Sequence, residues 1–310
     1  MNTRKVLLSN LILLLAAIIW GFAFVAQRVS IKYVGPFTYN GVRFALGSLS
    51  LLPVMLLMKN KSVAEAQNKV QSKDLLHASI IAGIFLFTAA SFQQIGLIYT
   101  SAGKAAFVTS LYIVFVPILG IFLRQRISSG IWLGALMALA GLYLLCVTES
   151  LTVSKGDWLE LAGAFFWAFH ILIIGYFGKR VNVVKLSCIQ FAICSVLSLA
   201  AALIFEKIEL GTLMQAAMPI LYGGIFSVGV AYTLQAIGQK NANPSHAAII
   251  LSMEALFATV GGALFLKEAL VAREITGCVL MLSGMLLSQL QGFRGQGTAS
   301  NTLESKNQVV

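Results

Sequence analysis

The chain has 310 residues, of which 58% are hydrophobic and only 11% are charged, and its mean hydropathy is +0.87. Soluble globular domains carry about a quarter charged residues, so this composition excludes a water-soluble enzyme or binding domain. The formal net charge of +11 would suit a nucleic-acid-binding protein, but the basic residues lie in short loops and not on one exposed face. We therefore expect no nucleic-acid partner.

Polar interruptions divide the chain into ten apolar stretches, each close to the roughly 20 residues that a helix needs to cross a membrane. They are 6–27, 36–58, 75–98, 103–123, 128–147, 158–178, 184–205, 214–237, 244–266 and 271–290. The first stretch resembles a signal peptide but has no convincing cleavage site, so we expect a retained helix. The segment 292–310 is polar and rich in Gly, Ser, Thr and Asn, which predicts a disordered cytoplasmic tail.

The second half of the chain repeats the first. Trp167 follows Trp20 by 147 positions and Gln190 follows Arg43 by the same interval, whereas the matches from Gln93 onward lie 142 or 143 positions apart. The matched pairs include Arg43-Phe-Ala with Gln190-Phe-Ala, Gln93 with Gln235, Lys104 with His246, Phe115 with Phe257, and Gly134 with Gly277. Each copy has five helices, an odd number, so the second copy enters the membrane in the opposite sense. We predict an all-α integral membrane protein with ten transmembrane helices in two inverted-topology five-helix repeats, 1–147 and 148–291.

The short loops predict the orientation. With the N-terminus inside, the cytoplasmic positions hold about twice as many Lys and Arg residues as the opposite side, which is the usual bias. We therefore expect a multi-pass protein of the cell inner membrane with both termini in the cytoplasm. Inverted repeats are typical of secondary transporters. The expected partners are a small-molecule substrate, membrane lipid and a candidate coupling proton, and the chain could be a monomer or a homodimer.

Several motifs carry a family resemblance over about residues 10–290. They are Ala-Ile-Ile-Trp-Gly-Phe-Ala-Phe at 17–24, Arg43-Phe-Ala, Thr100-Ser-Ala-Gly-Lys-Ala-Ala-Phe, and Leu-Ser-Met-Glu-Ala-Leu-Phe-Ala at 251–258 followed by Phe265-Leu-Lys-Glu268. In their order and spacing they resemble the drug/metabolite transporter superfamily, specifically its EamA-type ten-helix permeases. The resemblance implies alternating-access transport, with export of an amino acid or a related amphipathic compound. This chain has Glu254-Ala255 where the family often has Glu-Pro, which leaves a kink of the ninth helix in doubt.

Two charged residues within apolar helices are the first candidates for the substrate or ion pathway. An unpaired carboxylate such as Glu254 costs at least ~2.5–3.5 kcal/mol in the middle of a membrane helix. Glu254 could exchange a proton or bind a substrate ammonium, or it could form a fixed structural pair. Arg43 could bind a substrate carboxylate through both guanidinium nitrogens. Alternatively, Arg43 neutralises Glu254 or caps the carbonyls of a broken helix.

Other candidates are aromatic or polar residues at membrane depth. Trp20, Trp167 and Tyr112, the repeat mate of Glu254, could line a central cavity or simply pack. Gln93, Gln190 and Gln235 could bind substrate or form hydrogen bonds between helices. Lys104 and His246 begin equivalent helices, where they could belong to the pathway or anchor the chain at the membrane interface.

The sequence offers little chemistry for other functions. We find no metal-ligand spacing, no ATP-binding Walker motif and no paired nucleophile and base. We therefore predict no metal, no cofactor, no catalytic residue and no enzyme activity. Within transport, the alternatives are exchange or import of an anionic metabolite, favoured if Arg43 and Lys104 both face the cavity, and multidrug export.

Overall fold

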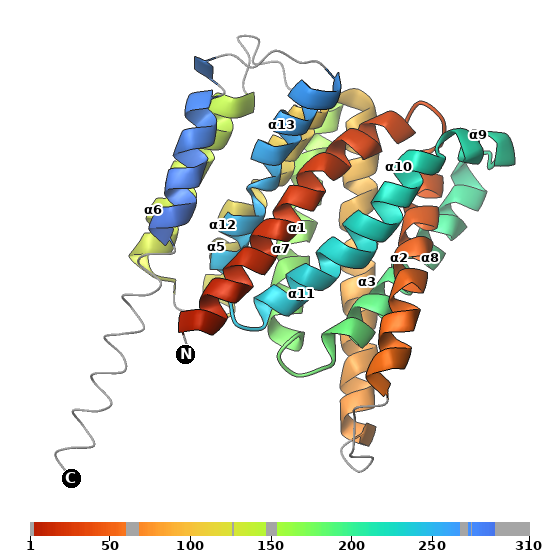
Figure 1. Ribbon diagram of the computed structural model, residues 1–310, viewed down its shortest axis with the longest axis horizontal. Coiled ribbons are helices and arrows are strands. Elements are labelled where there is room, and N and C mark those ends of the chain that lie inside the picture. The colour runs from red at the N-terminus through yellow and green to blue at the C-terminus, as the bar shows by residue number, and fades with distance from the viewer. Residues whose placement is uncertain are drawn as a thin grey trace.

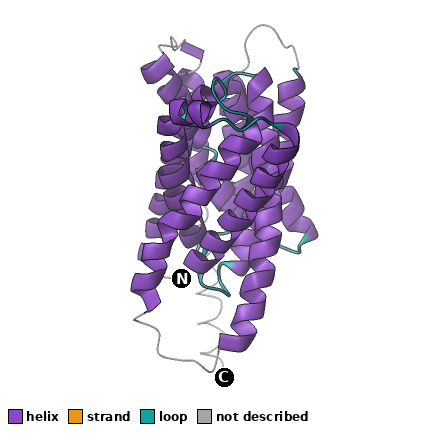
Figure 2. Cartoon of the chain, turned by 90° about the vertical axis from the view of Figure 1, so that its right-hand side faces the viewer, coloured by secondary structure: helices purple, strands orange, loops and turns teal. Residues whose placement is uncertain are grey.

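The computed structural model describes residues 3–59, 68–125, 127–146, 154–266, 272–273 and 275–288, and within these ranges every regular element is a helix (Figures 1 and 2). Eight stretches are long and apolar enough to cross a membrane: Arg4–Ser30, Pro36–Leu57, Lys73–Tyr99, Ala102–Phe122, Lys155–Phe177, Val183–Phe205, Ala217–Gln239 and Pro244–Phe265. Two shorter apolar helices, Ser129–Leu144 and Ile275–Ser288, lie where the fifth and tenth stretches were predicted. The predicted all-α membrane fold is confirmed.

Three predicted helices are divided into shorter elements. The labelled elements are α1 (Thr3–Ser30), α2 (Pro36–Lys59), α3 (Asn68–Tyr99), α4 (Ala102–Thr109), α5 (Tyr112–Phe122), α6 (Ser129–Cys146), α7 (Lys155–Phe177), α8 (Val183–Phe205), α9 (Leu210–Gln215), α10 (Ala217–Leu221), η1 (Tyr222–Tyr232), α11 (Thr233–Gln239), α12 (Pro244–Leu251) and α13 (Glu254–Leu266). The fourth stretch becomes α4 and α5, the eighth becomes α10, the π-helix η1 and α11, and the ninth becomes α12 and α13.

Equivalent helices of the two repeats run in opposite directions where they meet. Between α2 and α8, the Ser195 Oγ donates to the Gly41 carbonyl at 2.8 Å and the Ser48 Oγ donates to the Cys188 carbonyl at 2.9 Å. The residue numbers thus increase along one helix where they decrease along the other, so the two helices are antiparallel. The same holds between α6 and the helix 275–288, where Gly134 lies against Gly284 and Gly141 against Gly277. This antiparallel pairing is the inversion that the odd number of helices predicts.

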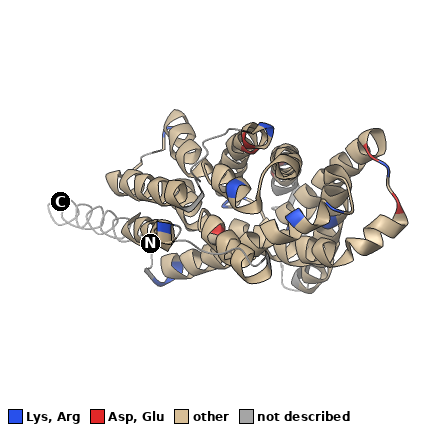
Figure 3. Ribbon diagram, turned by 90° about the horizontal axis from the view of Figure 1, so that it is seen from above, with Lys and Arg blue, Asp and Glu red and all other residues tan. Residues whose placement is uncertain are grey.

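In Figure 1, α1 begins at the lower left of the bundle, and the blue helix 275–288 runs downward on the same left-hand side. Seen from above, charged residues are sparse (Figure 3). Large apolar side chains such as Phe122, Leu203 and Leu57 are instead exposed on the surface, as in helices that face lipid. The predicted repeat boundary at 147–148 and the predicted tail 292–310 lie outside the described residues.

The start of α2 is held by a carboxylate from the second repeat. Glu206, the C-cap of α8, accepts hydrogen bonds from the backbone nitrogens of Phe37 and Thr38, both at 2.8 Å, and from the Thr38 Oγ1 at 2.7 Å. A negative charge at this position satisfies free N–H groups and complements the positive end of the helix dipole.

We expect Glu206→Gln to lower the free energy of unfolding by about 1.5 kcal/mol, because the amide nitrogen that replaces one oxygen cannot accept these bonds. Thermal denaturation in detergent measures the loss. Glu209→Gln, the same change at an exposed residue without a side-chain cap bond, is the control. Equal melting temperatures for the two variants would contradict a role for Glu206 in joining the repeats.

Candidate functional site

The fourth and ninth predicted helices are broken at equivalent positions. Two backbone bonds that reach back three residues instead of four are shared by both breaks: Leu111 N to Val108 O and Ile113 N to Ser110 O in the first repeat, Met253 N to Ile250 O and Ala255 N to Ser252 O in the second. Each bond has its counterpart 142 positions later. Neither break contains Pro or Gly, so Ala255 in place of proline does not keep the ninth helix continuous.

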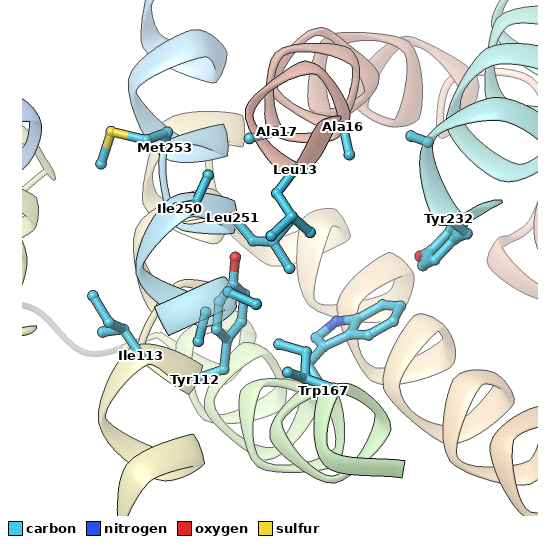
Figure 4. Packing of buried hydrophobic residues seen from close by; sticks show 14 of the residues in the cluster. Leu13, Ala16, Ala17, Tyr112, Ile113, Trp167, Tyr232, Ile250, Leu251 and Met253 are labelled. Atoms are coloured by element: carbon cyan, nitrogen blue, oxygen red, sulfur yellow. The ribbon is translucent and has the colours of Figure 1, made fainter. Parts of the chain in front are cut away.

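The breaks place Tyr112 at the start of α5 and Glu254 at the start of α13, and the two side chains meet. The Tyr112 hydroxyl donates to the Glu254 Oε1 at 2.9 Å, and these residues are only 3% and 5% exposed. In Figure 4 the tyrosine extends from α5 toward α12. The positive end of the α13 dipole stabilises an acidic group at this position, as in discontinuous helices of secondary transporters.

A cavity lies next to this contact. Its lining is mixed aromatic, polar and apolar, and consists of Trp20, Phe24, Gln27, Arg43, Gln93, Thr109, Tyr112, Trp167, Ile171, Ser227, Tyr232, Gln235, Leu251 and Glu254. The space in it that is open to the centre of a water molecule is about 30 Å³, which is enough for one or two water molecules. A metabolite would therefore fit only after the surrounding helices move apart.

Aromatic rings form one wall of the cavity. The Tyr232 ring, at the end of η1, lies 4.6 Å from the Trp20 ring and 5.9 Å from the Trp167 ring between centroids. Figure 4 shows Trp167 and Tyr232 on facing elements. The indole nitrogens are fixed, since the Trp20 Nε1 donates to the Ser227 carbonyl at 3.1 Å and the Trp167 Nε1 donates to the Gln93 Oε1 at 2.9 Å. The wall thus offers flat apolar faces for a substrate.

Arg43 is held at the cavity by neutral groups. It is 2% exposed, its Nε donates to the Asn40 Oδ1 at 3.0 Å, and its guanidinium carbon lies 5.0 and 4.9 Å from the ring centroids of Tyr39 and Phe44. No carboxylate of the described residues lies within 4.0 Å of it. The alternative in which Arg43 neutralises Glu254 by direct pairing is therefore not the arrangement seen here, because both groups face the cavity separately.

Seven of the ten predicted pathway residues line the cavity: Trp20, Arg43, Gln93, Tyr112, Trp167, Gln235 and Glu254. The other three lie outside its lining. The Gln190 Oε1 accepts from the His170 Nε2 at 3.0 Å, Lys104 forms an ion pair with Asp157 at 2.7 Å, and His246 contacts the Ser288 Oγ at 3.3 Å. Transport roles for all ten residues stay predictions.

Sequence reasoning missed several polar residues at the site. The Gln27 Oε1 accepts from the Gln93 Nε2 at 3.3 Å, and Thr109 and Tyr232 line the cavity directly. Glu160, fully buried on α7, accepts a hydrogen bond from Thr109. Glu160 could have been found from the sequence, because it is an acidic residue within the apolar stretch 158–178. The repeat does not point to Tyr232, since its repeat mate is the small apolar residue Ala90. Within the described residues, no three His, Cys, Asp or Glu side chains gather as a metal site.

Comparison with known proteins identifies the family of this chain. The model of the EamA-like transporter family matches residues 7–147 and again 154–290. An "Uncharacterized transporter" of Archaeoglobus fulgidus is 30% identical over 294 residues, 93% of this chain and 87% of its own. The "Uncharacterized transporter YoaV" of Bacillus subtilis is 21% identical over 87% of this chain and 93% of its own. A crystal structure 19% identical shares the fold, with a TM-score of 0.74 over 92% of this chain and 98% of its own. The chain belongs to the EamA-like transporter family.

Proposed function

We propose that this transporter is a secondary active exporter that moves an amino acid or a related amphipathic metabolite out of the cytoplasm across the cell inner membrane, in exchange for a proton. It acts by alternating access and catalyses no reaction. The observation that carries the proposal is that one basic and one acidic side chain, Arg43 and Glu254, line the same cavity and are not bound to each other. A zwitterion has the complementary pair of charges.

The cavity residues suit the parts of such a substrate. Arg43 can bind the carboxylate through the two terminal nitrogens of its guanidinium, and Glu254 can bind the ammonium. The rings of Trp20, Trp167 and Tyr232 give the side chain an apolar surface. When the substrate leaves, Glu254 takes up a proton, because an isolated carboxylate at this depth is costly. The equivalent breaks in the fourth and ninth helices let either half open toward its own side of the membrane.

One observation weighs against an anion exchanger. That function is favoured if Lys104 and Arg43 both supply positive charge to the cavity, but the Lys104 Nζ lies 2.7 Å from the Asp157 Oδ2 and outside the lining. A multidrug exporter would use the same carboxylate and aromatic wall for a lipophilic cation. The substrate screen below includes both of these classes.

We expect purified protein in liposomes to move labelled amino acids when a pH gradient is imposed, and Glu254→Gln to reduce this flux at least about tenfold. Glutamine can neither exchange a proton nor carry the charge that binds the ammonium, so the variant loses both proposed roles of Glu254. A tenfold change in flux corresponds to ~1.4 kcal/mol, which is smaller than the cost of placing a carboxylate at this depth. Cationic drugs and phosphorylated metabolites are screened in parallel. Glu209→Gln, the same substitution at an exposed residue, is the control and should keep the wild-type flux.

Each other outcome identifies a different function. Gradient-independent exchange of phosphorylated metabolites that survives in Glu254→Gln would replace the proposal with anion exchange. Flux of cationic drugs without flux of amino acids would indicate a multidrug exporter. Amino-acid flux that is equal in Glu254→Gln and wild type would remove Glu254 from the coupling step.

A further inference from the structure

Glu160 is a second buried carboxyl group, and it lies outside the cavity lining. It is 0% exposed on α7, where its Oε2 accepts a hydrogen bond from the Thr109 Oγ1 at 2.8 Å. Its Oε1 is buried without a hydrogen-bond partner, and among the described residues no Lys, Arg or His nitrogen lies within 4.0 Å. A carboxylate left in this state would be strongly destabilising, so its surroundings require an explanation.

The equivalent place, where Leu13 of the first repeat meets the second repeat, shows how the fold fills this position without a charge. The repeat mates of Glu160, Gly96 and Thr109 are Leu13, Gly238 and Leu251. A Cβ on Gly96 would lie 2.8 Å from the Glu160 Oε1, and a Cβ on Gly238 would lie 2.7 Å from the Leu13 Cγ. The helices therefore approach each other in the same way in both halves. Leucine satisfies this packing, so the fold does not require a carboxyl group at 160.

The contacts of Glu160 are those of a neutral carboxylic acid. One oxygen accepts from Thr109, while the other has no hydrogen-bond partner and, among the described residues, no cation within 4.0 Å, so the neutral acid costs far less here than an uncompensated carboxylate. The close approach of Gly96 to the Oε1 leaves room for a hydrogen but not for a hydrated cation. A proton is therefore the ligand that fits this group.

Glu160 lies between one membrane face and the cavity. One turn earlier on α7 is Asp157, which forms its ion pair with Lys104, a residue whose side chain is 34% exposed, and accepts from the Thr100 hydroxyl at 3.2 Å. On the other side, Thr109 lines the cavity that also contains Glu254. The predicted orientation puts the Lys104–Asp157 face outside.

The other ionisable groups near Glu160 are few. On α3, which carries Gly96, Tyr99 lies at the helix end beside Gly156. On α1, the Arg28 Nη1 donates to the Leu97 carbonyl at 2.7 Å. Among the described residues, the charged and titratable groups around the site include Asp157, Lys104, Tyr99 and Arg28 toward the face, and Tyr112 and Glu254 toward the cavity.

We propose that Glu160 is a proton-binding site present in only one half of the transporter, which passes a proton from the Lys104–Asp157 face to the central cavity through Thr109. A proton from the water at the face binds the Glu160 carboxylate. The carboxyl group then rotates to bring its O–H to Thr109, and the Thr109 hydroxyl turns from Glu160 toward the cavity. The Thr109 oxygen accepts the proton of Glu160 as it releases its own to a water in the cavity, from which Glu254 accepts it. The leucine pair Leu13 and Leu251 closes the equivalent route at the opposite face. This proposal rests on the proposed proton-coupled export.

Infrared difference spectroscopy tests this site without any substrate. Protein in lipid nanodiscs is compared at neutral and alkaline pH through the C=O stretch of protonated carboxyl groups, because a carboxyl group that is neutral at rest loses this band only as the pH rises. We expect a band in the wild type that Glu160→Gln removes, a separate band that Glu254→Gln removes, and no change from the exposed control Glu209→Gln. Spectra without a Glu160-dependent band would overturn the proposal. So would a band that sodium ions suppress at constant pH, because that result indicates a sodium site.

Glu160→Leu separates proton coupling from folding. Leucine already fills the equivalent position in the first repeat, and an apolar residue in place of a buried carboxyl group commonly keeps or raises stability, so we expect a melting temperature at least equal to that of the wild type. In liposomes, flux driven by the pH gradient should fall at least tenfold in this variant, whereas unchanged flux would contradict the route. A wild type without gradient-driven flux would refute the proposed function instead, and the infrared result would stand by itself.

Discussion

Replacing Arg43 by leucine is expected to lower amino-acid transport about 100-fold at substrate concentrations below saturation. Among the described residues of the cavity lining, the guanidinium is the one positive group. A bidentate pair with a carboxylate is worth about 1.5–3 kcal/mol, which corresponds to roughly one to two factors of ten. Arg43→Lys should recover only part of the loss, because an ammonium cannot reproduce the fork or the bond from the Nε to Asn40.

A pair of probes shows whether Arg43 binds the substrate carboxylate or only supports the fold. Labelled phenylalanine and phenethylamine differ by that carboxylate, so Arg43→Leu should impair uptake of the amino acid far more than uptake of the amine. Arg180→Leu is the matched control, since Arg180 also lies over a tyrosine ring, at 3.5 Å from its centroid, but is exposed at the surface. Equal losses for both probes would assign Arg43 a structural role.

The repeat interval predicted much of the cavity lining, for a geometric reason. Two inverted copies are related by an axis through the middle of the membrane, so equivalent residues near that axis lie on opposite sides of one space. Trp20 and Trp167 are such mates and both line the cavity, as do Gln93 and Gln235. Tyr112 and Glu254 are mates that form a hydrogen bond. Lys104 and His246 are mates too, but they begin their helices far from the axis.

The sequence was least informative where the halves differ. Arg43 faces the cavity, whereas its mate Gln190 uses its amide oxygen to contact His170 outside the lining. Tyr232 has the small residue Ala90 as its mate, and its position depends on the π-helix η1, which no local residue pattern announced. The breaks at Ser110 and Ser252 were not foreseen either, since helix breaks are normally recognised by Pro or Gly.

The close approach of α1 to α13 leads to the second large expected effect. A Cβ on Gly21 would lie 2.8 Å from both the Ala258 nitrogen and the Glu254 carbonyl oxygen, and still closer to the Phe257 Cβ. Two of these three atoms belong to the backbone and cannot turn aside. Gly21→Val should therefore lower the free energy of unfolding by at least the ~1–3 kcal/mol typical of overpacking, and it should abolish transport because it displaces the helix start that carries Glu254.

Thermal denaturation in detergent and flux in liposomes measure the two effects of Gly21→Val. Gly211→Val is the matched control, because nothing lies within 4 Å of a Cβ at that glycine on α9, and it should leave both measurements close to wild type. Ala168, the repeat mate of Gly21, carries a Cβ without penalty and is fully buried, so the tight contact belongs to the half that holds Glu254. A Gly21→Val protein that melts and transports like Gly211→Val would show that the position of Glu254 does not depend on the contact between α1 and α13.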